Sequence, residues 1–209
     1  MLDRFKDFWQ GVVLAPIVRL LLWLKVSPDV VTLVGTLGLV VAALWFFPRG
    51  DLLVGVLVIT CFVFSDLVDG AMARASGRTS AFGAFWDSTL DRFGDAAIFV
   101  GLALYFAGPG EHQVNLYLSL YCLVMGSVTS YARARAESLG MDAKGGIAER
   151  ADRLVLILVL TGLSEIFDLP VLVPVALWVL AVASTVTVVY RIAKVYRQAS
   201  AHDAGHEVS

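Results

Sequence analysis

The chain has 209 residues, a formal net charge of -2 and a hydrophobic content of 58%, and its mean hydropathy is +0.79. A water-soluble protein of this size could not bury that much apolar surface, so the composition excludes an ordinary soluble domain. The small net charge gives no bulk field that would favour nucleic-acid binding, and the length fits a single domain.

Residues 1–26 are expected to form an amphipathic juxtamembrane segment. Polar and charged residues separate apolar residues that recur at helical spacing, namely Phe5, Phe8, Trp9, Val12 and Val13. This pattern is typical of a helix that lies in the headgroup layer of a membrane. A first spanning helix over 8–24 is the alternative, but Pro16 and Arg19 would interrupt it. The same two residues argue against a signal peptide.

A Ser27-Pro28-Asp29 sequence then precedes six apolar runs. Ser27 or Asp29 is expected to cap the first helix. Each run is close to the ~20 residues that a helix needs to cross a bilayer. The runs cover residues 29–48, 52–74, 82–107, 114–136, 152–168 and 170–192.

These runs predict an all-α fold, a six-transmembrane-helix bundle with an N-terminal amphipathic interfacial helix. We expect one membrane domain over residues 1–198, with the six spans within 29–195. The polar residues 199–209 are expected to form a flexible cytosolic tail.

The distribution of cationic residues predicts the orientation in the membrane. Six spans place both termini on one side, and if that side is the cytosol, only Arg49 of the 16 Lys and Arg residues lies outside. Cytosolic loops of membrane proteins are enriched in Lys and Arg, so cytosolic termini are predicted. The predicted cytosolic cations are Arg4, Lys6, Arg19, Lys25, Arg74, Arg78, Arg92, Arg133, Arg135, Lys144, Arg150, Arg153, Arg191, Lys194 and Arg197.

Four aspartates lie in the second and third runs. Asp66 and Asp69 are three residues apart, and Asp87 and Asp91 are four apart, so each pair shares one helix face. The short connection between the runs predicts antiparallel neighbouring helices. The four carboxylates can then converge near the cytosolic ends of these helices, and Asp95 extends the second stripe by one turn.

Four carboxylates so close together need either protonation or bound cations. An all-oxygen set favours a hard ion such as magnesium, manganese or calcium, and two facing pairs fit a two-metal phosphotransfer site. Gly70 and Gly83 would let a nucleotide or a neighbouring helix approach closely. The alternatives are the cation site of a transporter or channel, or a solvated loop with salt bridges to Arg74, Arg78 and Arg92.

The spacing D-x-x-D-G-x-x-A-R-x(8)-G-x-x-x-D-x-x-x-D resembles the signature of the CDP-alcohol phosphotransferase family. Its fixed positions are Asp66, Asp69, Gly70, Ala73, Arg74, Gly83, Asp87 and Asp91. The resemblance implies a metal-dependent, usually homodimeric enzyme that binds two Mg²⁺ or Mn²⁺ ions through the four aspartates, with Asp91 also acting as general base. The implied contacts of the CDP-lipid are Pro28, Asp29, Val30, Val31, Thr32, Gly70, Arg74, Ser80 and Gly83.

Within this family, residues 28–32, 130–137 and 146–154 look like those of actinobacterial phosphatidylinositol-phosphate synthases. The resemblance implies transfer of the phosphatidyl group from CDP-diacylglycerol to inositol 1-phosphate at the cytosolic face of a bacterial cell membrane. The implied ligands of the acceptor phosphate are Arg133, Arg153 and Arg191. The first of these positions departs from the lysine expected there.

Two alternatives to this acceptor site stay open. The arginines could serve only to bind lipid headgroups and to orient the chain in the membrane. A phosphatidylglycerophosphate synthase would share the eight motif residues and would use glycerol 3-phosphate, which is also a phosphorylated acceptor.

Overall fold

The computed structural model describes residues 15–77 and 80–206, and over these ranges the secondary structure is entirely helical. The predicted all-α fold is therefore confirmed for this part of the chain. The apolar repeat between Phe5 and Val13 lies outside the described residues. The helices are α2 (Ala15–Trp23), α3 (Pro28–Phe46), η2 (Phe47–Arg49), α4 (Leu52–Val63), α5 (Ser65–Ser76), α6 (Ala81–Ala107), α7 (Gln113–Ser138), α8 (Arg150–Ile166) and α9 (Leu172–His206).

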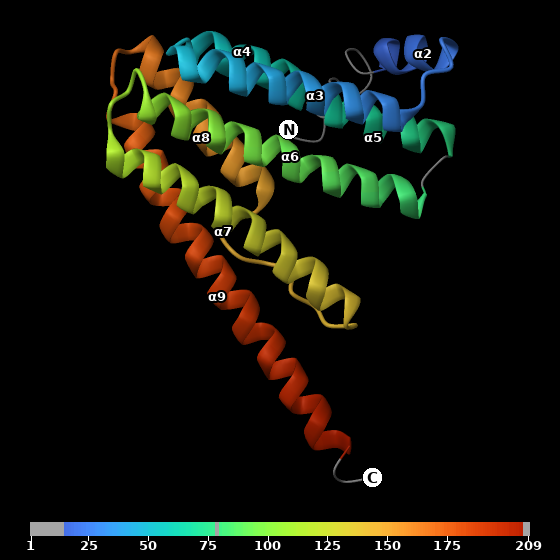
Figure 1. The fold of residues 1–209 in the computed structure, drawn as a ribbon. Coiled ribbons are helices and arrows are strands. Elements are labelled where there is room, and N and C mark those ends of the chain that lie inside the picture. Colours follow the sequence, from blue (N-terminus) through green and yellow to red (C-terminus); the bar gives the residue numbers. More distant parts are fainter. Residues whose placement is uncertain (1–14, 78–79, 207–209) are drawn as a thin grey trace, which may run out of the picture.

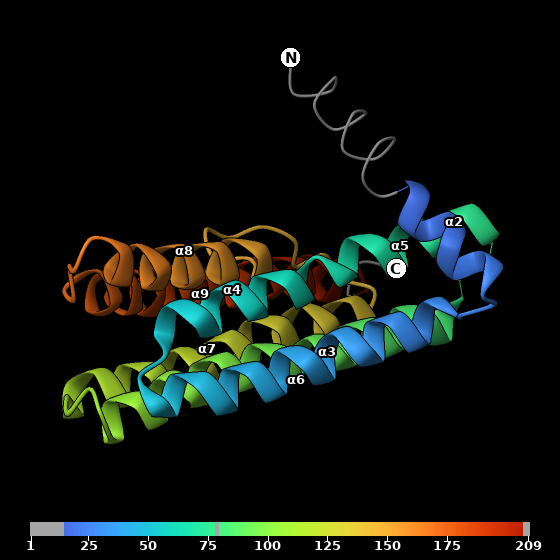
Figure 2. The ribbon, with the colours of Figure 1, turned by 90° about the horizontal axis from the view of Figure 1, so that it is seen from above.

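The long helices form two layers (Figure 1, Figure 2). α3, α6 and α7 lie side by side in one layer, and α4, α8 and α9 lie in the other. α3 packs on α4 at one edge of the layers, and α7 packs on α9 at the other edge. These helices thus form a closed ring around an apolar core that includes Phe47, Ile59, Ile98 and Leu177.

Side-chain caps fix the starts of α3 and α6. The Ser27 hydroxyl accepts a hydrogen bond from the backbone N–H of Val30 (3.4 Å), and Pro28 occupies the first turn of α3. The predicted cap at Ser27 is therefore confirmed. Ser80 caps α6 in the same way, because its hydroxyl accepts from the backbone N–H of Gly83 (2.9 Å).

Gly101 lets α6 approach the backbone of α3. A Cβ atom at this position would lie 2.6 Å from the carbonyl oxygen of Ala43, so no larger side chain fits without displacing a helix. Small residues at such contacts are common in membrane proteins. α3 and α6 run in the same direction, so this contact keeps their N-terminal ends next to each other at one end of the bundle (Figure 1).

The predicted run 52–74 forms two helices rather than one. α4 ends at Val63 and α5 begins at Ser65. The Ser65 hydroxyl donates to the carbonyl oxygen of Phe62 (2.6 Å), a bond that competes with the regular helical pattern. Ser65 also lies against Gly35 of α3, which has no side chain to exclude it. The break lets α5 pack along the first half of α3.

Within the described residues, three helical stretches are long and apolar enough to cross a membrane: Pro28–Arg49, Leu52–Ala75 and Leu172–Ser200. With the composition, they identify the chain as a membrane protein. α6 and α7 have 27 and 26 residues but carry charged side chains toward one end, and α8 has 17 residues. Length and composition alone therefore support three of the six predicted spans.

The segment between α7 and α8 (residues 139–149), here the α7–α8 segment, is bound along one face of α9. Thr187 accepts hydrogen bonds from the backbone N–H groups of Ile147 (3.1 Å) and Ala148 (3.2 Å). One turn further along α9, Arg191 donates to the carbonyl oxygen of Gly145 (3.1 Å). These bonds fix the place at which α8 begins.

Asp142 binds the beginning of the same segment to α9. Its carboxylate pairs with Lys194 (2.8 Å), and its backbone N–H donates to the side-chain oxygen of Gln198 (2.9 Å). The Lys194 ammonium, which hydrogen-bonds the carboxylate, lowers the pKa of Asp142 below its usual value. The carboxylate is therefore ionised, and the contact present, at neutral pH.

Two consecutive glycines allow the α7–α8 segment to lie close to α9. Gly145 and Gly146 have φ angles of 103° and 123°, a region that favours glycine. A Cβ atom on Gly146 would lie 2.3 Å from the side chain of Thr187, and one on Gly145 would lie 3.3 Å from the ring of Tyr190. Both the backbone conformation and the contact therefore require small residues here.

Candidate active site

A cavity of about 310 Å³ lies at the end of the bundle where α3 and α6 begin. Its walls come from the starts of α3 and α6, from α5, and from the first residue of α8. The lining residues are Pro28, Asp29, Thr32, Asp69, Gly70, Ala73, Ser80, Gly83, Ala84, Asp87 and Arg150. α5 and α6 are antiparallel, as predicted (Figure 1). Each packs on α3, and the cavity lies between them, so their carboxylates face each other across a space.

Asp69 and Asp87 place carboxylates in the walls formed by α5 and α6. Asp69 is buried, and one of its oxygens accepts a hydrogen bond from the hydroxyl of Thr32 on α3. Asp66 precedes Asp69 by one turn on α5, and its side chain lies outside the described part of the structure. Among the side chains that are described, no group of three or more His, Cys, Asp and Glu residues forms a metal site.

The donor chemistry of the cavity nevertheless fits a hard divalent cation. Asp69 and Asp87 supply carboxylate oxygens, and no histidine or cysteine is among the lining residues. Two carboxylates that share one cavity repel each other unless a cation neutralises them. Magnesium retains waters or takes phosphate oxygens as further ligands, and the cavity leaves room for them.

Asp91 lies one turn beyond Asp87 on α6 and pairs with Arg150. Arg150 Nη1 is 2.8 Å from Asp91 Oδ1, and Arg92 Nη2 is 3.9 Å from Asp91 Oδ2. Arg150 also lines the cavity. The sequence predicted Arg150 only as one of the cytosolic cations, because its position beside Asp91 depends on a contact between helices that are far apart along the chain.

Asp95, one further turn along α6, is buried and binds two arginines of α8. Its Oδ1 atom accepts from Arg150 Nε (3.2 Å), and its Oδ2 atom accepts from Arg153 Nη2 (3.0 Å). The only sequence signal for this residue is its place in the aspartate stripe of α6.

Most of the predicted CDP-lipid contacts line the cavity, namely Pro28, Asp29, Thr32, Gly70, Ser80 and Gly83. Val30 and Val31 are not among the lining residues. α3 turns by about 100° per residue, so it presents only positions 28, 29 and 32 to the cavity. The Val30 side chain is 49% exposed.

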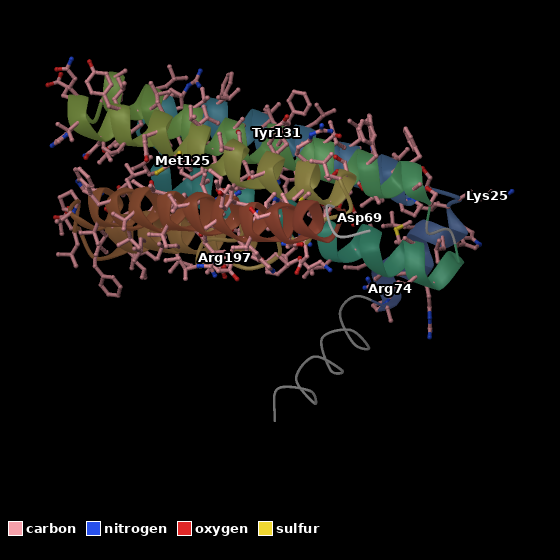
Figure 3. All side chains as sticks on the ribbon, turned by 90° about the horizontal axis from the view of Figure 1, so that it is seen from below. Lys25, Asp69, Arg74, Met125, Tyr131 and Arg197 are labelled. Atoms are coloured by element: carbon pink, nitrogen blue, oxygen red, sulfur yellow. The ribbon has the colours of Figure 1, made fainter. Side chains whose placement is uncertain are left out.

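Arg74 lies at the edge of the cavity rather than in its wall. Its side chain is exposed, and a Cβ atom on Gly70 would lie 3.4 Å from Arg74 Nη1. Figure 3 shows Asp69 and Arg74 on α5, with Asp69 nearer to the middle of the bundle. The guanidinium is thus placed over the glycine that follows Asp69.

Two of the predicted acceptor arginines, Arg153 and Arg191, are buried, with 1% and 3% of their surfaces exposed. Arg153 Nη1 donates to the carbonyl oxygen of Ala148 (3.1 Å). Arg191 Nη1 donates to the carbonyl oxygen of Thr129 on α7 (2.6 Å). Both guanidinium groups are therefore oriented by backbone carbonyls as well as by acidic side chains.

Arg133 completes the predicted set at a more exposed position. It pairs with Glu137 one turn along α7 (3.0 Å). Arg133 and Arg153 are both close enough to Arg191 to interact with its charge. The structure thus brings the three arginines into one cationic group, which contacts Asp95 through Arg153.

Residues 25–189 match the CDP-alcohol phosphatidyltransferase family. The chain is 49% identical over 210 residues to the phosphatidylinositol phosphate synthase of Streptomyces avermitilis, an alignment that covers 98% of this chain and 86% of that protein. It is 50% identical over 204 residues to the phosphatidylinositol phosphate synthase of Cutibacterium acnes, covering 94% of this chain and 98% of that protein.

The solved structures of a third relative share the fold. The crystal structure of Mycobacterium tuberculosis phosphatidylinositol phosphate synthase with CDP-DAG bound has a TM-score of 0.84 and 42% identity, covering 88% of this chain and 94% of that chain. The same enzyme in complex with manganese and citrate has a TM-score of 0.83 and 42% identity, covering 88% of this chain and 89% of that chain. The chain therefore belongs to the CDP-alcohol phosphatidyltransferase family.

Proposed function

We propose that the chain transfers the phosphatidyl group of CDP-diacylglycerol to inositol 1-phosphate, giving phosphatidylinositol phosphate and CMP. One observation carries this proposal: an acidic cavity and a cationic group lie next to each other. Asp69 and Asp87 line the cavity, and Asp95 links its wall to the arginines through Arg150 and Arg153. The relatives from S. avermitilis and C. acnes are named for this reaction.

The proposed metal ligands are Asp66, Asp69, Asp87 and Asp91, for two Mg²⁺ or Mn²⁺ ions. When bound, divalent ions neutralise phosphate charge and stabilise the charge that develops on the leaving group. The shared cavity of Asp69 and Asp87 supports this proposal, as does the one-turn spacing of the other two aspartates from them. The M. tuberculosis enzyme was solved in complex with manganese.

The CDP moiety is proposed to bind between α3, α5 and α6. Gly70 and Gly83 leave room for its base and phosphates, and a Cβ atom on Gly83 would crowd the Ser80 hydroxyl at 3.2 Å. The exposed guanidinium of Arg74 is placed to pair with a phosphate oxygen at the rim.

Asp91 is the proposed general base. It takes the proton from the attacking hydroxyl of the acceptor, whose oxygen forms a bond to the β-phosphorus of the CDP-lipid. The bond from that phosphorus to the bridging oxygen breaks, and its electron pair leaves with CMP. Arg150, 2.8 Å from Asp91, holds the carboxylate in place at the cavity wall.

The phosphate of the acceptor is proposed to bind Arg133, Arg153 and Arg191. A phosphate carries charge that a dense cationic set can match, whereas a neutral polyol does not need one. Glycerol 3-phosphate carries the same group, so phosphatidylglycerophosphate synthase is the second candidate on chemistry alone. The named relatives favour inositol phosphate.

We further propose that α3, α4 with α5, α6, α7, α8 and α9 form six spans of one domain (residues 1–198), with residues 199–209 as a cytosolic tail. The cavity and both termini then face the cytosol, and two copies form the homodimer usual in the family. Arg49 would lie at the outer face, where its guanidinium is 3.7 Å from the ring centroid of Trp45.

An acceptor screen with purified protein and radiolabelled CDP-diacylglycerol tests the reaction. Release of CMP should require Mg²⁺ or Mn²⁺ together with inositol 1-phosphate. Asp91→Asn should lower kcat by on the order of 10²–10⁴-fold while the protein still folds and binds CDP-diacylglycerol. Release of CMP with glycerol 3-phosphate, but not with inositol 1-phosphate, would assign the second candidate instead.

A further inference from the structure

Asp95 connects two helices that belong to different layers. α6, which carries it, packs on α3 and α7, whereas α8 packs on α4 and α9. The Asp95 carboxylate reaches Arg150 and Arg153 in the first turn of α8, 55 and 58 residues away along the chain. The bridge thus crosses the interior of the ring at the end where the cavity lies.

The two oxygens of Asp95 bind different arginines. Oδ1 binds Arg150, whose guanidinium also pairs with Asp91 (2.8 Å) and lines the cavity. Oδ2 binds Arg153, which belongs to the group proposed to hold the acceptor phosphate. One carboxylate therefore contacts an arginine of the donor side and an arginine of the acceptor side.

Three arginines lie around the bridge. Arg92, Arg150 and Arg153 pair with Asp91 and Asp95. Arg153 is 1% exposed, and its Nε atom has no hydrogen-bond partner among the described residues. The Arg153 guanidinium packs closely on Gly126, since a Cβ atom there would lie 3.3 Å from Nε. Buried donors in proteins are normally satisfied, so a ligand oxygen is expected here.

We propose that Asp95 is a positioning residue of the transfer reaction: one of its oxygens holds Arg150 against Asp91, and the other fixes Arg153 for the phosphate of the acceptor. This inference rests on the proposed function. A planar guanidinium binds phosphate well only when its plane is fixed, and the carboxylate fixes it from behind. Asp95 itself contacts neither substrate.

The test compares Asp95→Asn and Asp95→Glu with the wild-type enzyme. Asparagine keeps the shape and removes the charge, whereas glutamate keeps the charge and moves the oxygens, so at least one variant should fold. In either variant, the KM for inositol 1-phosphate should rise by about tenfold to a hundredfold. The KM for CDP-diacylglycerol should stay within about twofold, whereas kcat should also fall, because Arg150 loses one of the bonds that hold it beside Asp91.

Calorimetric titration of inositol 1-phosphate into each variant gives a readout independent of turnover, and its Kd should rise with the KM. In an Arg153→Gln background, Asp95→Asn should raise the Kd for inositol 1-phosphate little further, because the two residues act as one unit. Asp152→Asn is the matched control: the same chemical change in the same turn of α8, next to Arg153, should leave both KM values unchanged.

Two failures are distinguishable in this design. A wild-type protein that makes no inositol-phosphate-dependent product would contradict the proposed function, whatever the variants do. If the wild type is active and both Asp95 variants keep its KM and Kd for inositol 1-phosphate, the positioning role is wrong. Equal rises in the KM for inositol 1-phosphate and the KM for CDP-diacylglycerol would also contradict the positioning role, because they would indicate a purely structural role.

Discussion

Thr32 connects the start of α3 to the acidic wall of the cavity. It is buried, and its hydroxyl lies within hydrogen-bond distance of Asp69 Oδ2 and 3.1 Å from the carbonyl oxygen of Pro28. A hydroxyl has a single proton to donate, and the bond to the carboxylate is the stronger of the two. The residue was predicted as a substrate contact, and the structure shows that it also orients a proposed metal ligand.

Replacing Thr32 by valine should weaken metal binding without disturbing the fold. The change keeps the shape of the side chain and removes the donor to Asp69, and loss of such a supporting bond lowers metal affinity by about tenfold to a hundredfold. Titration of Mn²⁺ followed by electron paramagnetic resonance measures this. Thr36→Val, one turn further along α3 and also buried, is the control. Equal affinity in the two variants would show that the Thr32 hydroxyl does not support the site.

The shared helix face of each aspartate pair could be predicted because the spacing of each pair lies within a single helix. A separation of three or four residues determines a shared helix face without any knowledge of the rest of the fold. The partners of Asp91 and Asp95 could not be predicted in this way. Arg150 and Asp95 are 55 residues apart, and they meet only because α8 begins at the end of the ring where α6 carries its acids.

At the scale of elements, the α7–α8 segment determines where α8 begins. In the sequence, this segment falls between the apolar runs 114–136 and 152–168, and nothing there indicates that it binds α9. The break between α4 and α5 was also missed, since apolar residues lead into it and neither Gly nor Pro marks it. In both places a side-chain hydroxyl decides the local structure: Ser65 at the helix break, and Thr187 on α9.

Thr187→Val should loosen the α7–α8 segment. The variant leaves the backbone N–H groups of Ile147 and Ala148 without their acceptor, and an unsatisfied buried donor costs about 1–3 kcal/mol. Thermal unfolding in detergent measures the loss, and hydrogen exchange should show faster exchange of these two amides. Thr185→Val on the same helix removes a hydroxyl that bonds Tyr121 and the carbonyl oxygen of Ala181 but no amide of the α7–α8 segment. An equal loss in the two variants would contradict a special role for Thr187.

At the scale of the whole molecule, three helices that do not meet the criteria for a span carry much of the proposed chemistry. α6 holds three of the acids near the cavity, α7 holds Arg133, and α8 begins with Arg150 and Arg153. Their polar ends lower the mean hydropathy, although their remaining residues pack in the same ring as the apolar helices. The charged residues of these helices therefore keep their mean hydropathy low. This explains why length and composition support three spans rather than the six that were predicted.

Single cysteines should report the orientation of the bundle. In a variant with Cys61 and Cys122 replaced by alanine, Asp51→Cys should react with a membrane-impermeant maleimide in intact spheroplasts. Lys144→Cys should react only after the membrane is opened, because the α7–α8 segment is proposed to face the cytosol. Both positions are exposed. Labelling of Lys144→Cys in intact cells would show that the orientation is reversed.

The close contact between the α7–α8 segment and α9 also restricts how this protein can change during evolution. Gly146 combines a φ angle of 123° with a neighbouring side chain 2.3 Å from where a Cβ atom would lie. A mutation there cannot be tolerated by adjusting the loop alone, because Thr187 would have to become smaller at the same time. Gly140 has a φ angle of 74° but open space around it, so insertions should accumulate near that end of the segment while positions 146 and 187 change only together.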